Sequence, residues 1–403
     1  MKLSKRIQNL AESKTLQSSD RARQLKAQGI DVISLTVGEP DFSTPDYIRT
    51  VAKQAIDQGV GDHYTPAAGA KDVRQGIRDY VERHNHVNYV PEEVFVANGA
   101  KAVLYDLLQV LIDPGDEVLI PEPYWVSYAE QVRLAGGIPK LIPLDPQTGF
   151  KLTTKALSKA LSDKTALLIL NYPNNPTGTV LTETELQAIG DFCVEHDLLI
   201  LADEIYNELV YETLPNGFSI ASISDAIKQQ TIVVSGVSKT YAMTGWRIGY
   251  CLADKAIIKA LSKFAGQVSG NPAGISQYAT LGAVSVDDPS VTAMREAFKK
   301  RRDLGYEAIR TLPGFELDVK PAGAFYFFPR CQKAAELTGY ETVDDFALAL
   351  LEEAHVATVV GSAFGLPEYL RLSYATSEEQ FAEGMVRIRH FIETKMAERA
   401  ESE

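Results

Sequence analysis

The run SGVSKTYAMTGWR, at residues 235–247, holds two cations whose spacing suits covalent and phosphate chemistry. Lys239 follows the apolar segment 231–234, and a lysine at the end of a buried strand is costly unless its amine is neutralised, paired or covalently used. A desolvated lysine loses its proton more readily and becomes a nucleophile for Schiff-base chemistry. Arg247 adds a fixed cation suited to a phosphate. The alternative is a surface lysine after an edge strand, and this segment alone does not distinguish the two.

Two further segments place ligand-type side chains after apolar strands. Asp203 and Tyr206 close the segment 198–202, and the carboxyl ends of parallel strands are where α/β proteins form ligand sites. A carboxylate there can pair with a protonated ring nitrogen, and a phenol can donate to a ring oxygen; the alternative is an aspartate that caps a helix. Asn175 lies in NYPNNPTG, at residues 171–178, where prolines and a glycine predict a rigid turn that aims the amide at a ligand.

Two more segments indicate a ligand site only in combination with those described above. Gly99 and Ala100 follow the apolar segment 94–97 and precede an amphipathic stretch, so small residues there let backbone N–H groups approach an anion. The turn is neither a dinucleotide fingerprint nor a Walker A loop. Trp125 follows the segment 117–121 and offers a flat surface for an aromatic ring, although a single tryptophan is more often part of a core.

Composition narrows the class of protein. The 403 residues carry a formal net charge of -13, which argues against a general nucleic-acid binder. Three widely spaced cysteines, Cys193, Cys251 and Cys331, predict reduced thiols rather than a disulfide framework. No apolar run reaches transmembrane length, and the basic N-terminal stretch lacks the apolar region of a secretory signal. We therefore expect a cytoplasmic protein with no membrane partner.

The pattern of hydrophobic residues predicts the elements that position these side chains. Strands that are apolar on both faces belong to sheets covered by helices on each side, and here such runs alternate with amphipathic stretches. The sequence therefore predicts an α/β domain over residues 45–285, with a mostly parallel central sheet. The apolar runs lie at residues 94–97, 117–121, 165–170, 198–202, 231–234 and 248–252.

The pattern changes after residue 285. The run Asp287-Asp-Pro-Ser could cap a long helix that runs to Arg310. Residues 286–403 predict a smaller α+β domain, and we expect the N-terminal segment 1–44 to join it as a lid. The strand-like segments of this domain lie at residues 315–319, 324–328, 357–360 and 369–373.

Taken together, these motifs resemble the class I aminotransferases, the pyridoxal-phosphate enzymes of fold type I, and most closely the prokaryotic aspartate aminotransferase subgroup. The resemblance covers nearly the whole chain, from Gly38-Glu-Pro-Asp-Phe to Arg371-Leu-Ser-Tyr-Ala-Thr. The motifs that carry it occur in the family's order: Asn175-Pro-Thr-Gly, Asp203-Glu-Ile-Tyr, Ser238-Lys239 and Gly245-Trp-Arg247-Ile-Gly.

The resemblance implies a role for each matching residue. Lys239 would be catalytic, carrying pyridoxal 5′-phosphate as a Schiff base and then moving the proton. Tyr64 would reach the neighbouring subunit's phosphate, which implies a homodimer with shared active sites. The other cofactor contacts would be Gly99, Ala100, Lys101, Trp125, Asn175, Asp203, Tyr206, Ser235, Ser238 and Arg247. The substrate contacts would be Gly38, Lys101, Trp125, Asn175 and Arg371.

One position departs from the family's pattern. Where part of the family has a phosphate-binding serine three residues before the lysine, this chain has Gly236, with Ser235 beside it. Which of Ser235 and Ser238 contacts the phosphate is therefore left open by the sequence.

The implied reaction is ping-pong transamination, with aspartate as first-choice donor and 2-oxoglutarate as first-choice acceptor. The aspartate subgroup has a lysine at the position of Lys101 that contacts a second carboxylate, and residues 13–15 resemble its lid segment; a solvent-facing Lys101 is the alternative. Aromatic amino acids or prephenate are the runner-up substrates, and a carbon–sulfur lyase is a further possibility. A cofactor-sensing regulator is disfavoured because no basic helix-turn-helix precedes residue 38. We expect no metal site, since His84 and His86 lack a third ligand.

Overall fold

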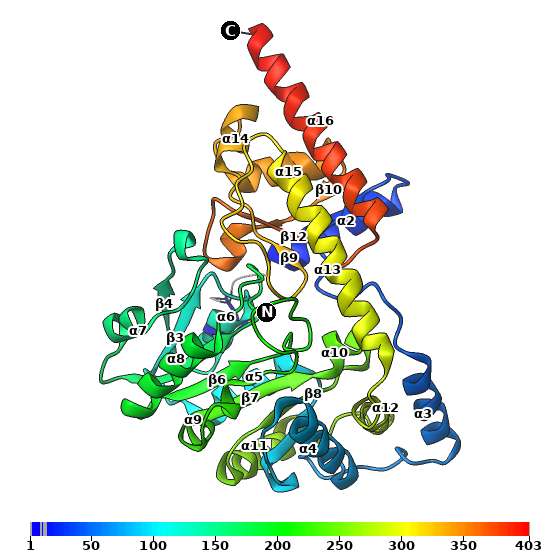
Figure 1. Cartoon of the computed structure of the whole chain (residues 1–403), viewed down its shortest axis with the longest axis vertical. Helices are drawn as coiled ribbons and strands as arrows, with labels where there is room; N and C mark the ends of the chain where they lie inside the picture. The colour runs from blue at the N-terminus through cyan, green and yellow to red at the C-terminus, as the bar shows by residue number, and fades with distance from the viewer. Residues whose placement is uncertain (1, 9, 11–13, 403) are drawn as a thin grey trace.

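The computed structural model describes residues 2–8, 10 and 14–402. The largest sheet in these ranges has seven strands (Figure 1). One strand, β8, runs antiparallel to both of its neighbours, and all other neighbouring pairs are parallel. This confirms the predicted α/β fold with a mostly parallel central sheet. In their order across the sheet, the strands are β2 (Val94–Ala97), β8 (Gly249–Leu252), β7 (Thr231–Gly236), β6 (Leu199–Asp203), β5 (Thr165–Asn171), β3 (Glu117–Glu122) and β4 (Ile138–Pro143).

The central strands are apolar on both faces because helices cover both faces of the sheet. In β5, Leu167 and Ile169 pack in one core with α5, α6 and α11, whereas Leu168 and Leu170 pack on the opposite face with α7, α8 and α9. The helices of the first face are α5 (Ala100–Leu111), α6 (Ser127–Leu134) and α11 (Lys255–Val268). Those of the second face are α3 (Asp46–Asp57), α4 (Lys71–Asn85), α7 (Thr154–Ala160), α8 (Glu183–Glu195), α9 (Asp225–Gln230) and α12 (Gly274–Val284).

One strand of this sheet, β4, does not appear among the apolar runs of the sequence. It lies at the edge of the sheet, where it pairs only with β3. Three of its residues, Ile138, Leu141 and Pro143, are exposed. A half-exposed edge strand need not form an apolar run, so the pattern that identifies central strands does not detect it.

A long helix, α13 (Pro289–Arg310), leads from this sheet to a smaller group of elements (Figure 1). Its start is capped as predicted, because the Asp288 carboxylate accepts a hydrogen bond from the Ser290 N–H at 2.8 Å. The smaller sheets are β1 (Ile33–Ser34) with β10 (Val356–Ala357), and β11 (Val359–Val360) with β12 (Leu370–Ser373) and β9 (Tyr326–Phe327). The remaining helices are α1 (Lys5–Gln8), α2 (Lys14–Ala27), α10 (Val237–Thr240), α14 (Gln332–Thr338), α15 (Val343–Glu352) and α16 (Glu378–Ser402).

The pairing of β1 with β10 is parallel and joins the N-terminal segment to the C-terminal part of the chain. The strand predicted at residues 315–319 is wrong: this stretch forms only an isolated bridge between Glu316 and Arg330. The domain boundaries at residues 44 and 285 stay a prediction, and Ser13 of the predicted lid lies outside the described residues. Within the described ranges, no helix is long and apolar enough to cross a membrane.

Candidate active site

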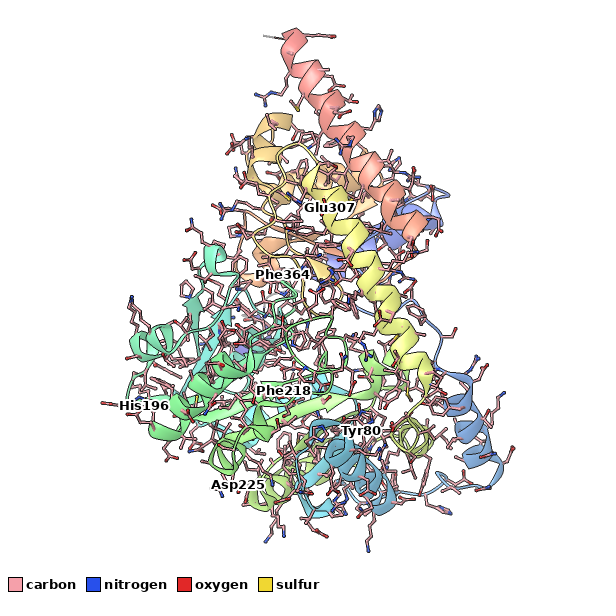
Figure 2. The ribbon with its side chains drawn as sticks, viewed as in Figure 1. Tyr80, His196, Phe218, Asp225, Glu307 and Phe364 are labelled. Carbon is pink, nitrogen blue, oxygen red and sulfur yellow. The ribbon has the colours of Figure 1, made fainter. Side chains whose placement is uncertain are left out.

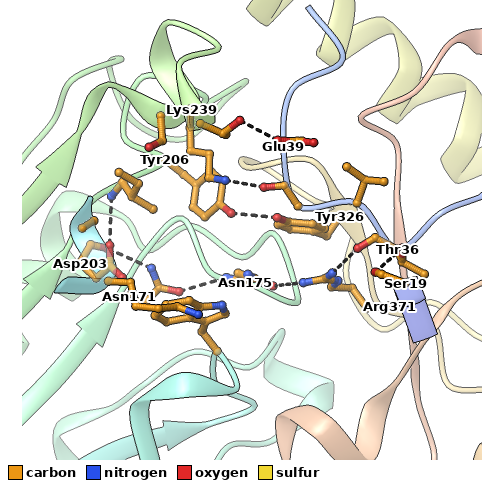
Figure 3. Close-up of a pocket in the computed structure, with 18 of the residues that line it drawn as sticks. Ser19, Thr36, Glu39, Asn171, Asn175, Asp203, Tyr206, Lys239, Tyr326 and Arg371 are labelled. Atoms are coloured by element: carbon orange, nitrogen blue, oxygen red, sulfur yellow. Dashed lines mark hydrogen bonds between the residues drawn. The ribbon is translucent and has the colours of Figure 1, made fainter. Parts of the chain in front are cut away.

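A cavity of about 670 Å³ lies where the carboxyl ends of β5, β6 and β7 meet the N-terminal segment and β12 (Figure 3). Parallel strands form ligand sites at this edge because polar groups of several strands converge there. The cavity brings together residues from segments that are far apart in the sequence. The predicted site residues that line it are Gly38, Ala100, Lys101, Trp125, Asn175, Asp203, Tyr206, Ser238, Lys239, Arg247 and Arg371.

Three predicted residues do not line the cavity. Gly99 lies beside it, in contact range of Arg247. Ser235 is buried and hydrogen-bonds with Tyr250, so Ser238 is the only serine of the two that faces the cavity. Tyr64 is 98% exposed.

Lys239 stands in α10, directly after β7, and its Nζ donates a hydrogen bond to the carbonyl oxygen of Gly38. Burial lowers the pKa of this lysine to about 8. The carboxylate of Glu39 opposes this shift because it favours the charged amine, whereas the cation Arg371 adds to it. Near pH 8 a large share of the amine is therefore unprotonated and nucleophilic.

Asp203, at the end of β6, is buried together with two hydrogen-bond donors. The Tyr128 hydroxyl donates to its Oδ2 at 2.6 Å, and the Ile205 N–H donates to its Oδ1 at 3.3 Å. Burial raises the pKa of Asp203 to about 6, although both hydrogen bonds lower it. The result is an oriented carboxylate whose charge a cationic partner would stabilise.

The sequence did not single out Tyr128 or its neighbour Asn171. Asn171 orients two site segments at once, because its Nδ2 donates to the Asp203 carbonyl at 3.0 Å and its Oδ1 accepts from the Asn175 N–H at 3.1 Å. The only sequence signal for Tyr128 is its apolar setting, since a buried phenol needs a polar partner. That signal does not say which partner.

Arg371, in β12, is a buried cation whose partners are all neutral (Figure 3). Its Nη1 donates to the amide oxygen of Asn175 at 3.1 Å and its Nη2 to the carbonyl oxygen of Thr36 at 2.8 Å. Its Nε has no partner within the described part of the chain, where no ion pair of Arg371 forms either. A buried guanidinium with a free donor suits a carboxylate, which it can hold with two hydrogen bonds.

The start of α5 and the side chain of Arg247 pack against each other closely. Gly99 has a φ of +95°, and a Cβ added there would lie 2.4 Å from Arg247 Nη2. A Cβ on Gly249 would lie 2.1 Å from the Ala100 nitrogen. Glycine at these positions permits the close approach of a helix N-terminus to a guanidinium, and Ala100, Arg247 and Ser238 all line the cavity. These donors fit a phosphate.

Tyr206 completes the central part of the cavity. Burial raises its pKa well above the usual value, so its hydroxyl stays protonated and can donate. Its hydroxyl lies 2.9 Å from that of Tyr326, which the sequence did not point to.

Lys101 and Trp125 form one wall. The Lys101 Nζ lies 4.8 Å from the centre of the Trp125 ring, which is a cation–π distance. Lys101 is an exposed residue of this wall. Partial desolvation by its surroundings lowers the pKa of its amine, and the charge of Arg247 lowers it further. Among the described residues, no group of three or more His, Cys, Asp or Glu side chains could hold a metal ion.

Comparison with known proteins identifies the family that this fold and site define. The family model "Aminotransferase class I and II" matches residues 30–388, and the chain belongs to this family. It is an aminotransferase. The chain is 45% identical to the aspartate aminotransferase of Bacillus subtilis over 98% of its own length and 99% of that protein.

Solved structures of aminotransferases are also similar to this chain. The aspartate aminotransferase of Thermus thermophilus with maleate matches with a TM-score of 0.91 and 38% identity, over 97% of this chain and all of that one. The aromatic aminotransferase of Pyrococcus horikoshii matches with a TM-score of 0.85 and 40% identity, over 94% of this chain and 99% of that one.

The burial of Asp203 predicts a pH-dependent effect of Asp203→Asn on the stability of the cofactor-free protein. Because burial raises the pKa from 3.8 to about 6, the carboxyl is protonated in both the folded and the unfolded state only well below pH 3.8, and the cost of its charge builds up between pH 3.8 and about 6. Above pH 6 its charge destabilises the fold. The substitution should therefore raise the free energy of unfolding by about 1–3 kcal/mol at pH 8, and by much less at pH 4, in urea titrations. An equal change at both pH values would contradict the assigned cause.

Proposed function

We propose that the protein binds pyridoxal 5′-phosphate in this cavity and transfers amino groups between L-aspartate and 2-oxoglutarate. The observation that carries the proposal is the meeting of three ionisable groups in one cavity: a partly buried amine with a lowered pKa, Lys239, a buried carboxylate, Asp203, and a buried guanidinium without an acidic hydrogen-bond partner, Arg371. The amine suits the reactive carbonyl of the cofactor, the carboxylate suits its ring nitrogen, and the guanidinium suits the α-carboxylate of an amino acid.

The residues around the cavity fit the parts of this cofactor. Arg247, Ser238 and the start of α5 would hold the phosphate, and Trp125 would stack on the ring. Asp203 would pair with the protonated ring nitrogen, which maintains the electron-withdrawing character that the cofactor supplies when it is bound. Tyr206 and Asn175 would donate to the ring oxygen.

Lys239 would hold the cofactor covalently until a substrate amine displaces it. Its freed Nζ would then take the proton from the substrate's α-carbon and return it on the cofactor side. A pKa of about 8 suits both roles, since the amine can bind and release a proton near neutral pH.

Arg371 would hold the α-carboxylate of the substrate, supported by Asn175 and the backbone of Gly38. Lys101 would contact a second carboxylate, as its place in the cavity wall allows. Aspartate is preferred because relatives named aspartate aminotransferase are 45% and 46% identical to this chain. Aromatic amino acids or prephenate are the second candidate, since a relative from Cereibacter sphaeroides, 41% identical, is named aspartate/prephenate aminotransferase.

The exposure of Tyr64 supports a homodimer with shared active sites. A tyrosine with 98% of its surface exposed lies outside the cavity of its own chain. In the proposed dimer, it reaches the phosphate in the cavity of the partner subunit.

The role of Lys239 predicts the outcome of Lys239→Ala. The variant should still bind the cofactor, because the phosphate and ring contacts remain, but turnover should fall by about 10²–10⁴-fold or more, since the group that moves the proton is lost. Turnover is measured as oxo-acid formation from aspartate and 2-oxoglutarate. Lys155→Ala, at an exposed position of helix α7, is the matched control and should behave like the parent protein. Near-normal activity of Lys239→Ala would exclude the assignment.

The role of Lys101 predicts a change in substrate preference. Lys101→Ala should lower kcat/KM for aspartate by about 10–100-fold, the usual effect of losing a hydrogen bond to a charged group, and should change kcat/KM for phenylalanine by less than about threefold. Lys101→Arg keeps the charge and should retain much of the aspartate activity. Equal losses for both donors would refute a contact to the second carboxylate.

A further inference from the structure

Tyr326 lies between two groups of the site and touches both (Figure 3). Its hydroxyl is 2.9 Å from the hydroxyl of Tyr206, and the centre of its ring is 4.4 Å from the guanidinium carbon of Arg371. The side chain is 1% exposed and lines the cavity. One residue therefore contacts both the phenol at the proposed ring oxygen and the cation at the proposed carboxylate site.

The fold holds Tyr326 firmly in this position. It stands in β9 and pairs with Ser373 of β12, the strand that carries Arg371. The ring of Phe325 packs beside it, with 4.7 Å between the ring centres. A Cβ on Gly38 would lie 3.2 Å from the Tyr326 hydroxyl, so the loop opposite also limits its movement. Figure 2 shows this strand region among the densely packed side chains above the main sheet.

We propose that Tyr326 is a positioning residue that orients Tyr206 through its hydroxyl and Arg371 through its ring face. This inference rests on the function proposed above. It adds to that function a direct link between the cofactor's ring oxygen and the site for the substrate's α-carboxylate.

The hydroxyl pair has a defined direction in the proposed complex. Either hydroxyl can donate in the free protein. When Tyr206 donates its single hydrogen to the ring oxygen, Tyr326 must donate to the Tyr206 oxygen. This makes Tyr206 a stronger donor, which stabilises negative charge on the ring oxygen. A proton held between that oxygen and the Lys239 nitrogen in the cofactor-loaded protein would then be lost more readily.

The ring face acts on Arg371 in a separate way. A guanidinium close to an aromatic face is attracted by the electron density of the ring, and the attraction grows when water is excluded. Arg371 has only neutral hydrogen-bond partners in the described chain, so the Tyr326 ring restricts the plane in which it meets a carboxylate.

Two variants separate the two contacts in the cofactor-loaded protein. Tyr326→Phe removes the hydroxyl and keeps the ring, whereas Tyr326→Leu removes both. Tyr374→Phe is the matched control, because Tyr374 is equally buried, hydrogen-bonds to the Ala324 carbonyl at 3.2 Å and does not line the cavity. The first readout is the midpoint pH at which the absorbance of the Lys239-linked cofactor changes. The second is the Kd of succinate, an unreactive dicarboxylate.

Tyr326→Phe should raise the midpoint by about 0.3–1 pH unit and leave the succinate Kd within twofold of the parent value. Tyr326→Leu should raise the succinate Kd by about 5–30-fold. The control should change neither quantity.

An unchanged midpoint in Tyr326→Phe would overturn the inference, even if Tyr326→Leu does not fold. So would a midpoint shift of the same size in the Tyr374→Phe control. A parent protein that takes up no cofactor would instead refute the proposed function, and this inference with it. A parent that loads and titrates normally while the Tyr326 variants match it would refute this inference alone.

Discussion

The cost of removing ionisable groups from water dominates this site, where a buried carboxylate, a buried guanidinium and a partly buried amine share one cavity. Asp203 ends β6, Lys239 lies in α10 directly after β7, and Arg371 lies within β12. Burial shifts the pKa of each in the direction that favours the neutral form. Such groups are unfavourable in an empty site and favourable beside a complementary ligand. The same burial that destabilises the cofactor-free protein would therefore favour the binding of the proposed cofactor and substrate, which together carry a cationic ring nitrogen, a reactive carbonyl and a carboxylate.

The scaffold supports this arrangement with neutral hydrogen bonds rather than with counter-charges. Tyr128 donates to Asp203, and Asn175 and the Thr36 carbonyl accept from Arg371. Because these partners carry no net charge, they fix orientation while leaving each charge available to a ligand. Glycine contributes at one end of the cavity, where the positive φ of Gly99 lets the start of α5 meet Arg247. These neutral partners are therefore as much a part of the site as the charged residues that they orient.

Much of this could be predicted from sequence because central strands buried on both faces leave continuous apolar runs, and reactive residues follow those runs directly. The segment 198–202 and Asp203 show this, and the resemblance to the aminotransferases gave each residue a role. Edge strand β4 left no such run, and the strand expected at residues 315–319 forms only a bridge. Tyr128 and Tyr326 were missed because a buried tyrosine looks like any core aromatic until its partner across the fold is known. Pairings over long sequence separations are set by tertiary packing, which local patterns do not encode.

The first half of the transamination reaction is the most direct test of the proposed function. Cofactor-loaded protein is mixed with L-aspartate in the absence of any oxo acid, and separately with L-phenylalanine, while the absorbance of the cofactor is followed. Aspartate should convert the cofactor rapidly to the pyridoxamine form, and phenylalanine should do so much more slowly. A faster response to phenylalanine would contradict the substrate assignment, and no conversion by either amino acid would contradict transamination from these donors.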